Sequence, residues 1–293
     1  MTNHVVILAG GVGSRLYPLS TPENPKQFID LLGCGKTMIQ LTCERFLCAA
    51  PDARFWVVTS SEYVHFVQEQ LPQIPPEQIL AEPCARNTAP CIAYACLKIR
   101  KKYPDANIMV TPADAYVPDN IAFAHAMRTA LAFSARRRAV ICMGISPTNP
   151  CTQYGYIQAE APGSNVVKVQ CFHEKPDAKT AARYLEDGGF WWNAGIFVWS
   201  VSTVEDEFRE YAPQIAAIMD KLEPYLYTPK ESAALARLFP QCDKISIDYA
   251  VMEKSRNVYM IPGRLEWSDL GSFESIEKVT GKKFKLNLEN SNL

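Results

Sequence analysis

The sequence lacks the features that would direct a chain of this length into or across a membrane. No uninterrupted apolar run approaches the roughly 20 residues that a membrane helix needs. The first residues, MTNHVVILAGG, have neither a basic flank nor a small-residue cleavage site, so they predict a first β-strand rather than a signal peptide. We therefore expect a cytoplasmic protein with no membrane partner.

An excess of charge of either sign is also missing. The chain holds 30 Lys and Arg residues against 31 Asp and Glu residues, which gives a formal net charge of −1. Without a global basic field, a protein is not drawn to nucleic acid or to anionic lipid. We therefore expect no nucleic-acid partner, and any phosphate binding must be local.

Metal-binding and disulfide patterns of cysteine are absent as well. The ten cysteines form no CxxC pair, and the four histidines are scattered without ligand spacing. Most cysteines, such as Cys91, Cys96 and Cys142, lie in apolar helical or strand contexts. We expect reduced, buried thiols in a cytosolic protein, and no metal held by His and Cys.

An activated nucleophile is missing too. The GxSxG pattern is absent, and no Ser or Cys has an evident His partner. This absence favours a reaction without a covalent intermediate, in which the protein positions its substrates and neutralises charge.

Short β-rich runs alternate with amphipathic helical patterns over the first half of the chain. Strands are expected at 4–9, 55–60, 78–82, 107–112 and 139–145. Helices are expected at 37–50, 62–71, 88–103 and 120–138. This alternation predicts βαβ units, and hence an α/β fold with a mainly parallel sheet and helices on both faces.

After about residue 150 the pattern changes. The sequence predicts a β-ribbon around the turn APGSN, then a helix, a strong strand, a long helical segment and a last strand, at 154–176, 178–187, 190–200, about 201–255 and 258–263. We expect a single domain over residues 1–280, with a polar tail at 281–293. A nucleotide half spans about 1–145 and a half that completes the substrate pocket spans about 146–280, with ligands outside the carboxyl ends of the strands.

Three glycines follow the first strand directly, in VVILAGGVGSRLYPLS. A GxGxxG dinucleotide fingerprint fails because Leu16 occupies the third glycine position, and a Walker A loop fails because no GK[ST] follows. In the remaining pattern, GGxGxR, glycines let backbone N–H groups approach phosphate oxygens. Arg15 offers a planar fork and Lys26 a mobile point charge. A glycine-rich turn with two solvated cations is the alternative interpretation.

Two carboxylates lie in loops after strands, far apart in the sequence. Asp114 in TPADAYVP follows a buried strand, and Asp269 in WSDLGSF follows another. Carboxylate oxygens are ligands that Mg²⁺ prefers, so the pair could clamp one ion on a triphosphate. An ordinary Asx-turn is the alternative for Asp114.

Three further stretches carry polar groups. In EPCARNTAP, Asn87 or Thr88 is a good helix cap, and the same groups could contact a base or ribose. In FHEKP, Glu174 could accept sugar hydroxyls and Lys175 could pair with a phosphate, although a surface turn is the simpler interpretation. Asn193 in WWNAGIFVW is a polar group in an apolar setting, so it needs a partner from the backbone or from a sugar.

Taken in order, these motifs resemble those of the mannose-1-phosphate guanylyltransferases (GDP-mannose pyrophosphorylases), within the sugar-nucleotide pyrophosphorylase group of nucleotidyltransferases. The resemblance runs from about residue 4 to about residue 276 through LAGGVGSRLYPLS, PKQF, EPCARNTAP, TPAD, YGYI, FHEKP, WWNAGIFVW and WSDLGSF. It implies a Rossmann-like (GT-A-like) sheet. It also implies a Mg²⁺-dependent in-line reaction of GTP with α-D-mannose 1-phosphate, which gives GDP-mannose and diphosphate. The expected form is a short one, without the isomerase domain of longer relatives, and a homodimer is left open.

The resemblance also assigns site residues. The groups acting on the reacting phosphates are Arg15, Lys26 and Lys175. The Mg²⁺ ligands are Asp114 and Asp269. The nucleotide-binding residues are Leu8, Ala9, Gly10, Gly11, Gly13, Glu82, Pro83, Asn87 and Thr88. The sugar-phosphate residues are Gly155, Glu174, Lys175 and Asn193.

Three positions depart from the family pattern. Ala85, Ala115 and Gln153 stand where family members commonly carry Gly, His and Gly, which affects fine substrate choice more than reaction type. Two alternatives stay open: transfer of another nucleotide or to another hexose 1-phosphate, and a non-catalytic subunit that binds sugar nucleotides. Retention of the phosphate and metal groups argues against the second alternative.

Overall fold

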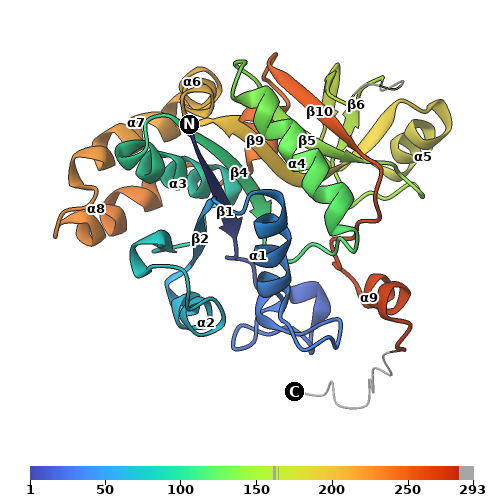
Figure 1. Cartoon of the computed structure of the whole chain (residues 1–293), viewed down its shortest axis with the longest axis horizontal. Helices are drawn as coiled ribbons and strands as arrows, with labels where there is room; N and C mark the ends of the chain where they lie inside the picture. Colours follow the sequence, from blue (N-terminus) through green and yellow to red (C-terminus); the bar gives the residue numbers. More distant parts are fainter. Residues whose placement is uncertain (161–162, 164, 284–293) are drawn as a thin grey trace.

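Alternating side chains of the first strand define the layers of the molecule. Val5 and Ile7 pack into one hydrophobic cluster and Val6 packs into another, and all three are fully buried. A strand buried on both faces belongs at the centre of a sheet covered by helices on each side. The structure is a computed structural model that describes residues 1–160, 163 and 165–283 (Figure 1).

One ten-stranded sheet forms the centre of the described part, in the order β3-β2-β1-β4-β9-β5-β10-β7, with β6 beside β8 and β9. The strands are β1 (Thr2–Leu8), β2 (Arg54–Ser60), β3 (Ile79–Glu82), β4 (Ala106–Pro112), β5 (Val140–Ile145), β6 (Tyr156–Gln158), β7 (Val167–Lys168), β8 (Cys171–His173), β9 (Phe190–Ser200) and β10 (Val258–Gly263). The first four strands are parallel, as β5 and β10 are to each other, whereas β9 is antiparallel to both β4 and β5. The expected mainly parallel α/β sheet is confirmed.

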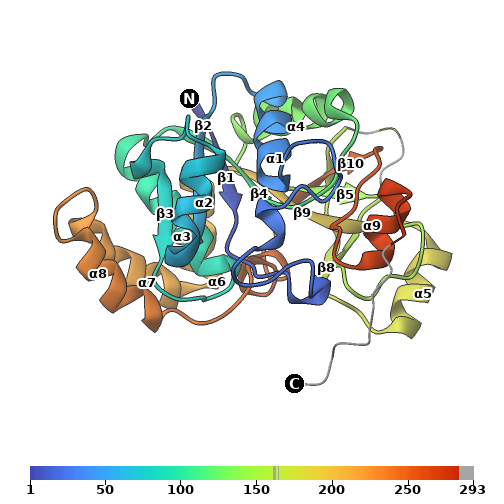
Figure 2. The same ribbon diagram turned by 90° about the horizontal axis from the view of Figure 1, so that it is seen from below.

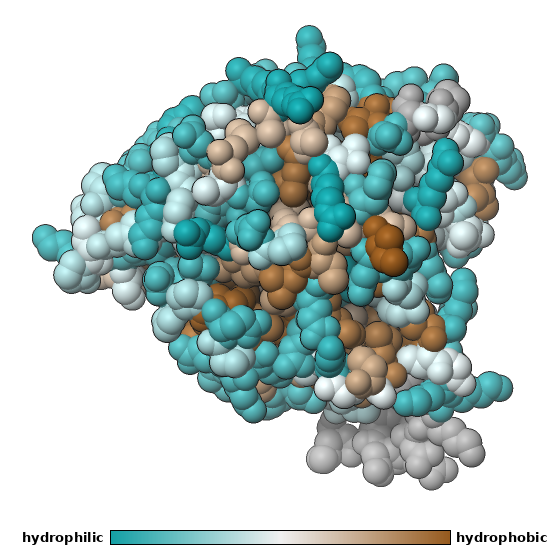
Figure 3. Space-filling view, viewed as in Figure 1, coloured by the Kyte–Doolittle hydropathy of each residue, from teal (hydrophilic) through white to brown (hydrophobic). Residues whose placement is uncertain are grey.

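Helices cover both faces of this sheet. They are α1 (Met38–Ala49), α2 (Val64–Gln70), α3 (Thr88–Lys102), α4 (Asn120–Ser134), α5 (Ala178–Asp187), α6 (Val201–Tyr211), α7 (Pro213–Leu222), α8 (Glu231–Leu238) and α9 (Phe273–Thr280). Figure 2 shows α1 and α4 on one side of the sheet and α6 and α7 on the other. Each side has its own hydrophobic cluster. The face of the molecule seen in Figure 3 is mostly hydrophilic and carries several smaller hydrophobic patches.

The expected elements of the first half are present, with small differences at their ends. The helix expected at 120–138 ends earlier, at Ser134, because Arg136, Arg137 and Arg138 are exposed and bury no apolar face. The helical segment expected at about 201–255 is confirmed. It is divided into several helices, one of which starts at Pro213, where a proline suits the first turn but not a helix interior.

The β-ribbon expected at 154–176 is correct only in part. β6 pairs with β8 in antiparallel fashion, but β7 leaves the ribbon and pairs with β10 at the sheet edge, which buries Val167. Residues 161, 162 and 164 of the expected turn lie outside the described residues, as do residues 284–293 of the expected tail.

Burial of the cysteines also differs from the expectation. All ten are free, and five are buried, including Cys91, Cys96 and Cys142. However, Cys34 and Cys48 are exposed, because they lie in a loop and on an outer helix turn. Among the described residues, no helix is both long and apolar enough to cross a membrane.

Candidate active site

The carboxyl ends of β1 and β4 lie side by side, with Leu8 opposite Pro112. The glycine-rich loop and the loop that carries Asp114 therefore meet at one edge of the sheet. A cavity of about 280 Å³ opens at this edge. Its lining includes every residue predicted to act on the reacting phosphates, to hold metal or to bind the sugar phosphate: Arg15, Lys26, Asp114, Gly155, Glu174, Lys175, Asn193 and Asp269.

Lys26 connects the two loops that carry Asp114 and Asp269. Its Nζ lies 2.8 Å from Asp114 Oδ2, and it donates a hydrogen bond to the main-chain oxygen of Asp269. The Lys26 side chain is only 6% exposed, so this ammonium group is held by its surroundings rather than by solvent. A carboxylate and a main-chain carbonyl from distant parts of the sequence are thus brought to one positive charge.

The Asp269 carboxylate is held in place from three directions. Its Oδ1 accepts hydrogen bonds from the Tyr154 hydroxyl at 2.8 Å and from the Gly271 backbone at 3.0 Å. Its Oδ2 lies 3.4 Å from the guanidinium of Arg15. Burial and the nearby Asp269 charge raise the pKa of Tyr154 well above its ordinary value, so the phenol keeps its proton and donates.

The glycine-rich loop is fixed by side chains from the segment that follows it. Gln27 Nε2 donates to the carbonyl oxygens of Ala9 and Gly11, each at 2.9 Å. Ser20 Oγ donates to the Val12 carbonyl at 2.6 Å and accepts from the Lys26 backbone at 2.8 Å. The same short segment therefore shapes the loop and positions the Lys26 side chain.

Gly13 has a positive φ of 68°, a conformation that favours glycine. A Cβ at this position would lie 2.9 Å from both Lys26 Cβ and Ser20 Oγ. The third glycine of the loop is therefore required by its backbone conformation and by the close approach of Lys26.

The predicted nucleotide-binding residues lie on the neighbouring part of the same edge and not in the lining of the cavity: Leu8, Ala9, Gly10, Gly11, Gly13, Glu82, Pro83, Asn87 and Thr88. Among these, Gly10, Gly11, Pro83 and Asn87 are exposed. Ala9 is buried, its N–H donates to Val58, and its carbonyl accepts from Gln27 and Thr59. Ala9 therefore has almost no exposed surface to offer a ligand, and its backbone polar groups are used within the fold.

Glu82 ends β3 as a buried carboxyl group. The Cys91 thiol donates to its Oε1 at 2.6 Å, and a Cβ on Gly10 would lie 3.4 Å from its Oε2. Burial raises the pKa of Glu82 to about 7. Glu82 therefore links the glycine-rich loop to the start of α3.

Asn87 and Thr88 have clear structural roles at the start of α3. The Asn87 side chain accepts a hydrogen bond from the Thr88 backbone at 2.8 Å, which confirms the expected helix cap. Thr88 Oγ1 accepts from the Ile247 backbone at 2.9 Å. These contacts tie the predicted nucleotide motif to the segment around residue 247.

Glu174 is a buried carboxylate that lines the same cavity. Its side chain is 4% exposed, and it forms an ion pair with Lys175. A Cβ on Gly155 would lie 2.5 Å from Glu174 Oε2, so a side chain there would displace the carboxylate. Asn193 Nδ2 donates to Asp248 Oδ1 at 3.0 Å.

Sequence reasoning missed the roles of Tyr154 and Asp248, which form hydrogen bonds with predicted residues of this cavity. Tyr154 stands directly before Gly155 in the YGYI motif, so its position in the sequence could have indicated a site residue. Its hydrogen bond to Asp269 joins distant segments, and no sequence pattern indicated it. Asp248 lies in a segment expected to be plain helix and belongs to none of the motifs of the sequence.

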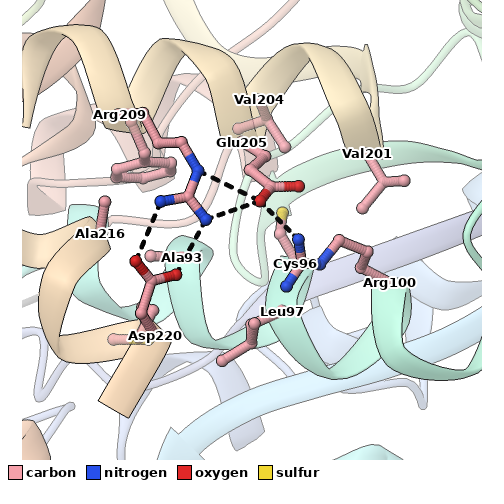
Figure 4. Close-up of a pocket in the computed structure, with 12 residues that line it drawn as sticks. Ala93, Cys96, Leu97, Arg100, Val201, Val204, Glu205, Arg209, Ala216 and Asp220 are labelled. Carbon is pink, nitrogen blue, oxygen red and sulfur yellow. Dashed lines mark hydrogen bonds and ion pairs between the residues drawn. The ribbon is translucent and has the colours of Figure 1, made fainter. Parts of the chain in front are cut away.

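A second, smaller pocket lies between α3, α6 and α7 (Figure 4). Its volume of about 40 Å³ is much smaller than that of the cavity at the sheet edge. Arg209 closes it with ion pairs to Glu205 at 2.9 Å and Asp220 at 2.8 Å. No predicted site residue lines it.

An open α/β sheet with a glycine-rich loop, clustered cations and two loop carboxylates at its carboxyl edge is typical of α/β proteins that bind phosphorylated ligands. The family model described as "Nucleotidyl transferase" matches residues 4–283. The chain belongs to this nucleotidyl transferase family.

Several known proteins resemble the chain over almost all of its length. The xanthan biosynthesis protein XanB of Xanthomonas campestris pv. campestris (strain B100) is 39% identical over 281 residues, which cover 94% of this chain and 59% of XanB. RfbM of Salmonella typhimurium, named mannose-1-phosphate guanylyltransferase, is 35% identical over 289 residues, covering 97% of this chain and 60% of RfbM. The chain thus spans about three fifths of the length of these curated relatives.

A solved structure from Thermus thermophilus has a similar fold. It is described as a mannose-1-phosphate geranyltransferase and superposes with a TM-score of 0.85 at 30% identity. The match covers 97% of this chain and 80% of that chain.

Proposed function

We propose that the chain catalyses guanylyl transfer from GTP to α-D-mannose 1-phosphate, giving GDP-mannose and diphosphate. The observation that carries the proposal is the convergence of Asp114 and Asp269 on Lys26, in a cavity that also contains Arg15 and Glu174. The relative RfbM, named for this activity, supports the choice of substrates.

The reaction needs no general base. An oxygen of the sugar phosphate, already anionic near neutral pH, attacks the α-phosphorus of GTP in line. A new P–O bond forms as the bond from the α-phosphorus to the α,β-bridging oxygen breaks, and diphosphate leaves. The main barrier is repulsion between two anions, which Arg15, Lys26 and Lys175 offset as positive charges in the same cavity.

The residues present fit the Mg²⁺ that the family resemblance implies. Asp114 and Asp269 offer hard oxygen donors, and each carboxylate already has a cationic neighbour, Lys26 for Asp114 and Arg15 for Asp269, which supports a site that accepts positive charge. We infer that these two acids would hold the ion, which would supply charge neutralisation on the phosphate oxygens when bound.

The two halves of the site suit different parts of the substrates. We infer that the nucleotide lies along the ends of β1 and β3, beside Gly10, Gly11 and Glu82, and that the hexose lies beside Glu174. Cytoplasmic localisation, a homodimer and the absence of a nucleic-acid partner stay predictions.

The proposal is tested by measuring diphosphate release with four nucleoside triphosphates and a panel of hexose 1-phosphates. We expect GTP with mannose 1-phosphate to give the highest kcat/KM, and GDP-mannose as the product. Faster turnover with UTP or dTTP would contradict the choice of nucleotide, and faster turnover with another hexose would contradict the choice of sugar.

A further inference from the structure

Asp248 is a carboxylate that lines the cavity together with Glu174 and Asn193, in the part of the site proposed for the hexose. No sequence motif indicated it. It begins a π-helical turn, Asp248–Met252, a local geometry that is frequent at functional sites. The segment before it is anchored to α3. Thr88 accepts a hydrogen bond from the Ile247 backbone at 2.9 Å, and the Ala89 backbone donates to the Ile245 carbonyl at 3.1 Å. The segment before Asp248 is thus held by residues that begin α3 and lie near the end of the motif EPCARNTAP.

Asn193 directs its side-chain amide toward the protein rather than leaving it free for a ligand. Its Nδ2 donates to Asp248 Oδ1 at 3.0 Å, and its Oδ1 accepts from the Gly195 backbone at 3.0 Å. The second bond fixes which end of the amide faces Asp248. Asn193 therefore acts as a positioning residue for the Asp248 carboxylate.

The Asp248 carboxylate still has room to accept hydrogen bonds. A carboxylate offers about four acceptor positions. Asn193 uses one of these positions, and the Ser246 hydroxyl also interacts with the group. Asp248 lines the cavity, so the remaining capacity is available to a bound molecule.

Two carboxylates face this half of the cavity without an equal number of positive charges. Glu174 is paired with Lys175, whereas Asp248 has a neutral amide as its hydrogen-bond partner. Burial, followed by the Glu174 charge, raises the pKa of Asp248 to about 6. A ligand that donates hydrogen bonds to the two carboxylates would stabilise their negative charge. A phosphate oxygen would be repelled by that charge.

We propose that Asp248 binds hydroxyl groups of the hexose and helps to determine sugar specificity, with Asn193 as its positioning residue. This inference rests on the proposed function, because it assigns the hexose, and not a phosphate, to this part of the cavity. Glu174 and Asp248 together would accept hydrogen bonds from different hydroxyls of one sugar ring. Arg15 and Lys26, which line the same cavity, would take the phosphates.

The test compares Asp248→Asn with wild type in steady-state kinetics and in calorimetric binding of mannose 1-phosphate. Hydrogen bonds to charged groups contribute enough that their loss should raise the KM and Kd for mannose 1-phosphate about 10- to 100-fold. The KM for GTP should change less than about twofold. Asp243→Asn, at an exposed acid of the same segment, is the matched control and should leave all constants unchanged.

Deoxy analogues of mannose 1-phosphate, modified at C2, C3, C4 or C6, identify the hydroxyl concerned. We expect one deoxy analogue to bind wild type more weakly than mannose 1-phosphate does. The same analogue should bind Asp248→Asn about as well as mannose 1-phosphate binds that variant, because the deoxy change and the substitution remove the same hydrogen bond. Asn193→Ala should weaken sugar binding without changing the KM for GTP, and it should add little to Asp248→Asn.

The inference is overturned if Asp248→Asn binds mannose 1-phosphate like wild type, or if every deoxy effect persists unchanged in the variant. An equal loss of GTP and sugar affinity would indicate a merely structural role and would also overturn it. If wild type binds mannose 1-phosphate but makes no GDP-mannose, the proposed function fails while the binding comparison still decides the role of Asp248. If wild type binds no hexose phosphate, both fail.

Discussion

Glu82 shows how burial changes the properties of a single acid at the sheet edge. It is 7% exposed, and its Oε1 accepts a hydrogen bond from the Cys91 thiol. Burial raises its pKa from an ordinary 4.5 to about 7. The folded state therefore disfavours the charged form. The resulting loss of stability is absent below pH 4.5, grows between pH 4.5 and 7, and is complete above pH 7.

Because charged Glu82 destabilises the folded state, we predict that Glu82→Gln raises the Tm at pH 8 by a few degrees. This rise corresponds to about 1–3 kcal/mol in the free energy of unfolding. The gain should shrink as the pH falls toward 5, because wild-type Glu82 is then neutral as well. Thermal unfolding of both proteins from pH 5 to pH 8 measures the difference. Glu69→Gln, at an exposed acid, is the control. A gain that is the same at pH 5 and pH 8 would contradict the account.

Some individual residues could be predicted from the sequence and others could not. Asp114 and Asp269 were expected to meet because both follow strands, and strand ends converge at one edge of an α/β sheet. The bond from Lys26 to the main chain of Asp269, and the bond from Asn193 to Asp248, depend on how distant segments pack. No local pattern encodes such contacts, so they appear only in the folded structure.

At the scale of elements, the glycine-rich loop and the segment that follows it form one unit. Ser20 and Gln27 hold the loop by hydrogen bonds, and Lys26 projects into the cavity from between them. Because Gly13 lies against Lys26 Cβ, a change in the loop displaces a residue that contacts the Asp114 carboxylate and the main chain of Asp269. The loop therefore positions a cation in addition to leaving backbone exposed.

We predict that Gly13→Ala lowers kcat/KM about 100-fold, because it shifts Lys26 away from the reacting phosphates. Gly35→Ala is a matched control. Gly35 has a comparable positive φ of 81°, but a Cβ there would meet nothing within 4 Å. The control should lose about 1–2 kcal/mol of stability from backbone strain alone and keep its activity. Equal loss of activity in the two variants would show that the contact with Lys26 is unimportant.

The elements themselves show what periodicity can and cannot predict. The strands at the centre of the sheet are continuous apolar runs with helices between them, so their existence follows from local pattern. The departure of β7 from the ribbon depends on its partner β10, which lies much later in the chain. The π-helical turn at Asp248 has the composition of an ordinary helix and could not be distinguished from one.

At the scale of the whole molecule, the cavity is built jointly by the two expected halves. The first half contributes Arg15, Lys26 and Asp114, and the second contributes Glu174 and Asp269. Neither half alone brings the two loop carboxylates together. The sheet makes this possible, because β9 lies between β4 and β5 and joins the two halves in one layer (Figure 1).

In the proposed reaction, guanylyl transfer at this cavity depends on Asp114 and Asp269. The most direct test is the rate of GDP-mannose formation from GTP and mannose 1-phosphate with Mg²⁺, for wild type, Asp114→Asn, Asp269→Asn and the exposed-site control Asp52→Asn. We predict that kcat of each site variant is about 10²- to 10³-fold lower than that of wild type, while the control keeps the wild-type rate. GDP-mannose formation by wild type, together with similar rates for the two site variants, would contradict the account.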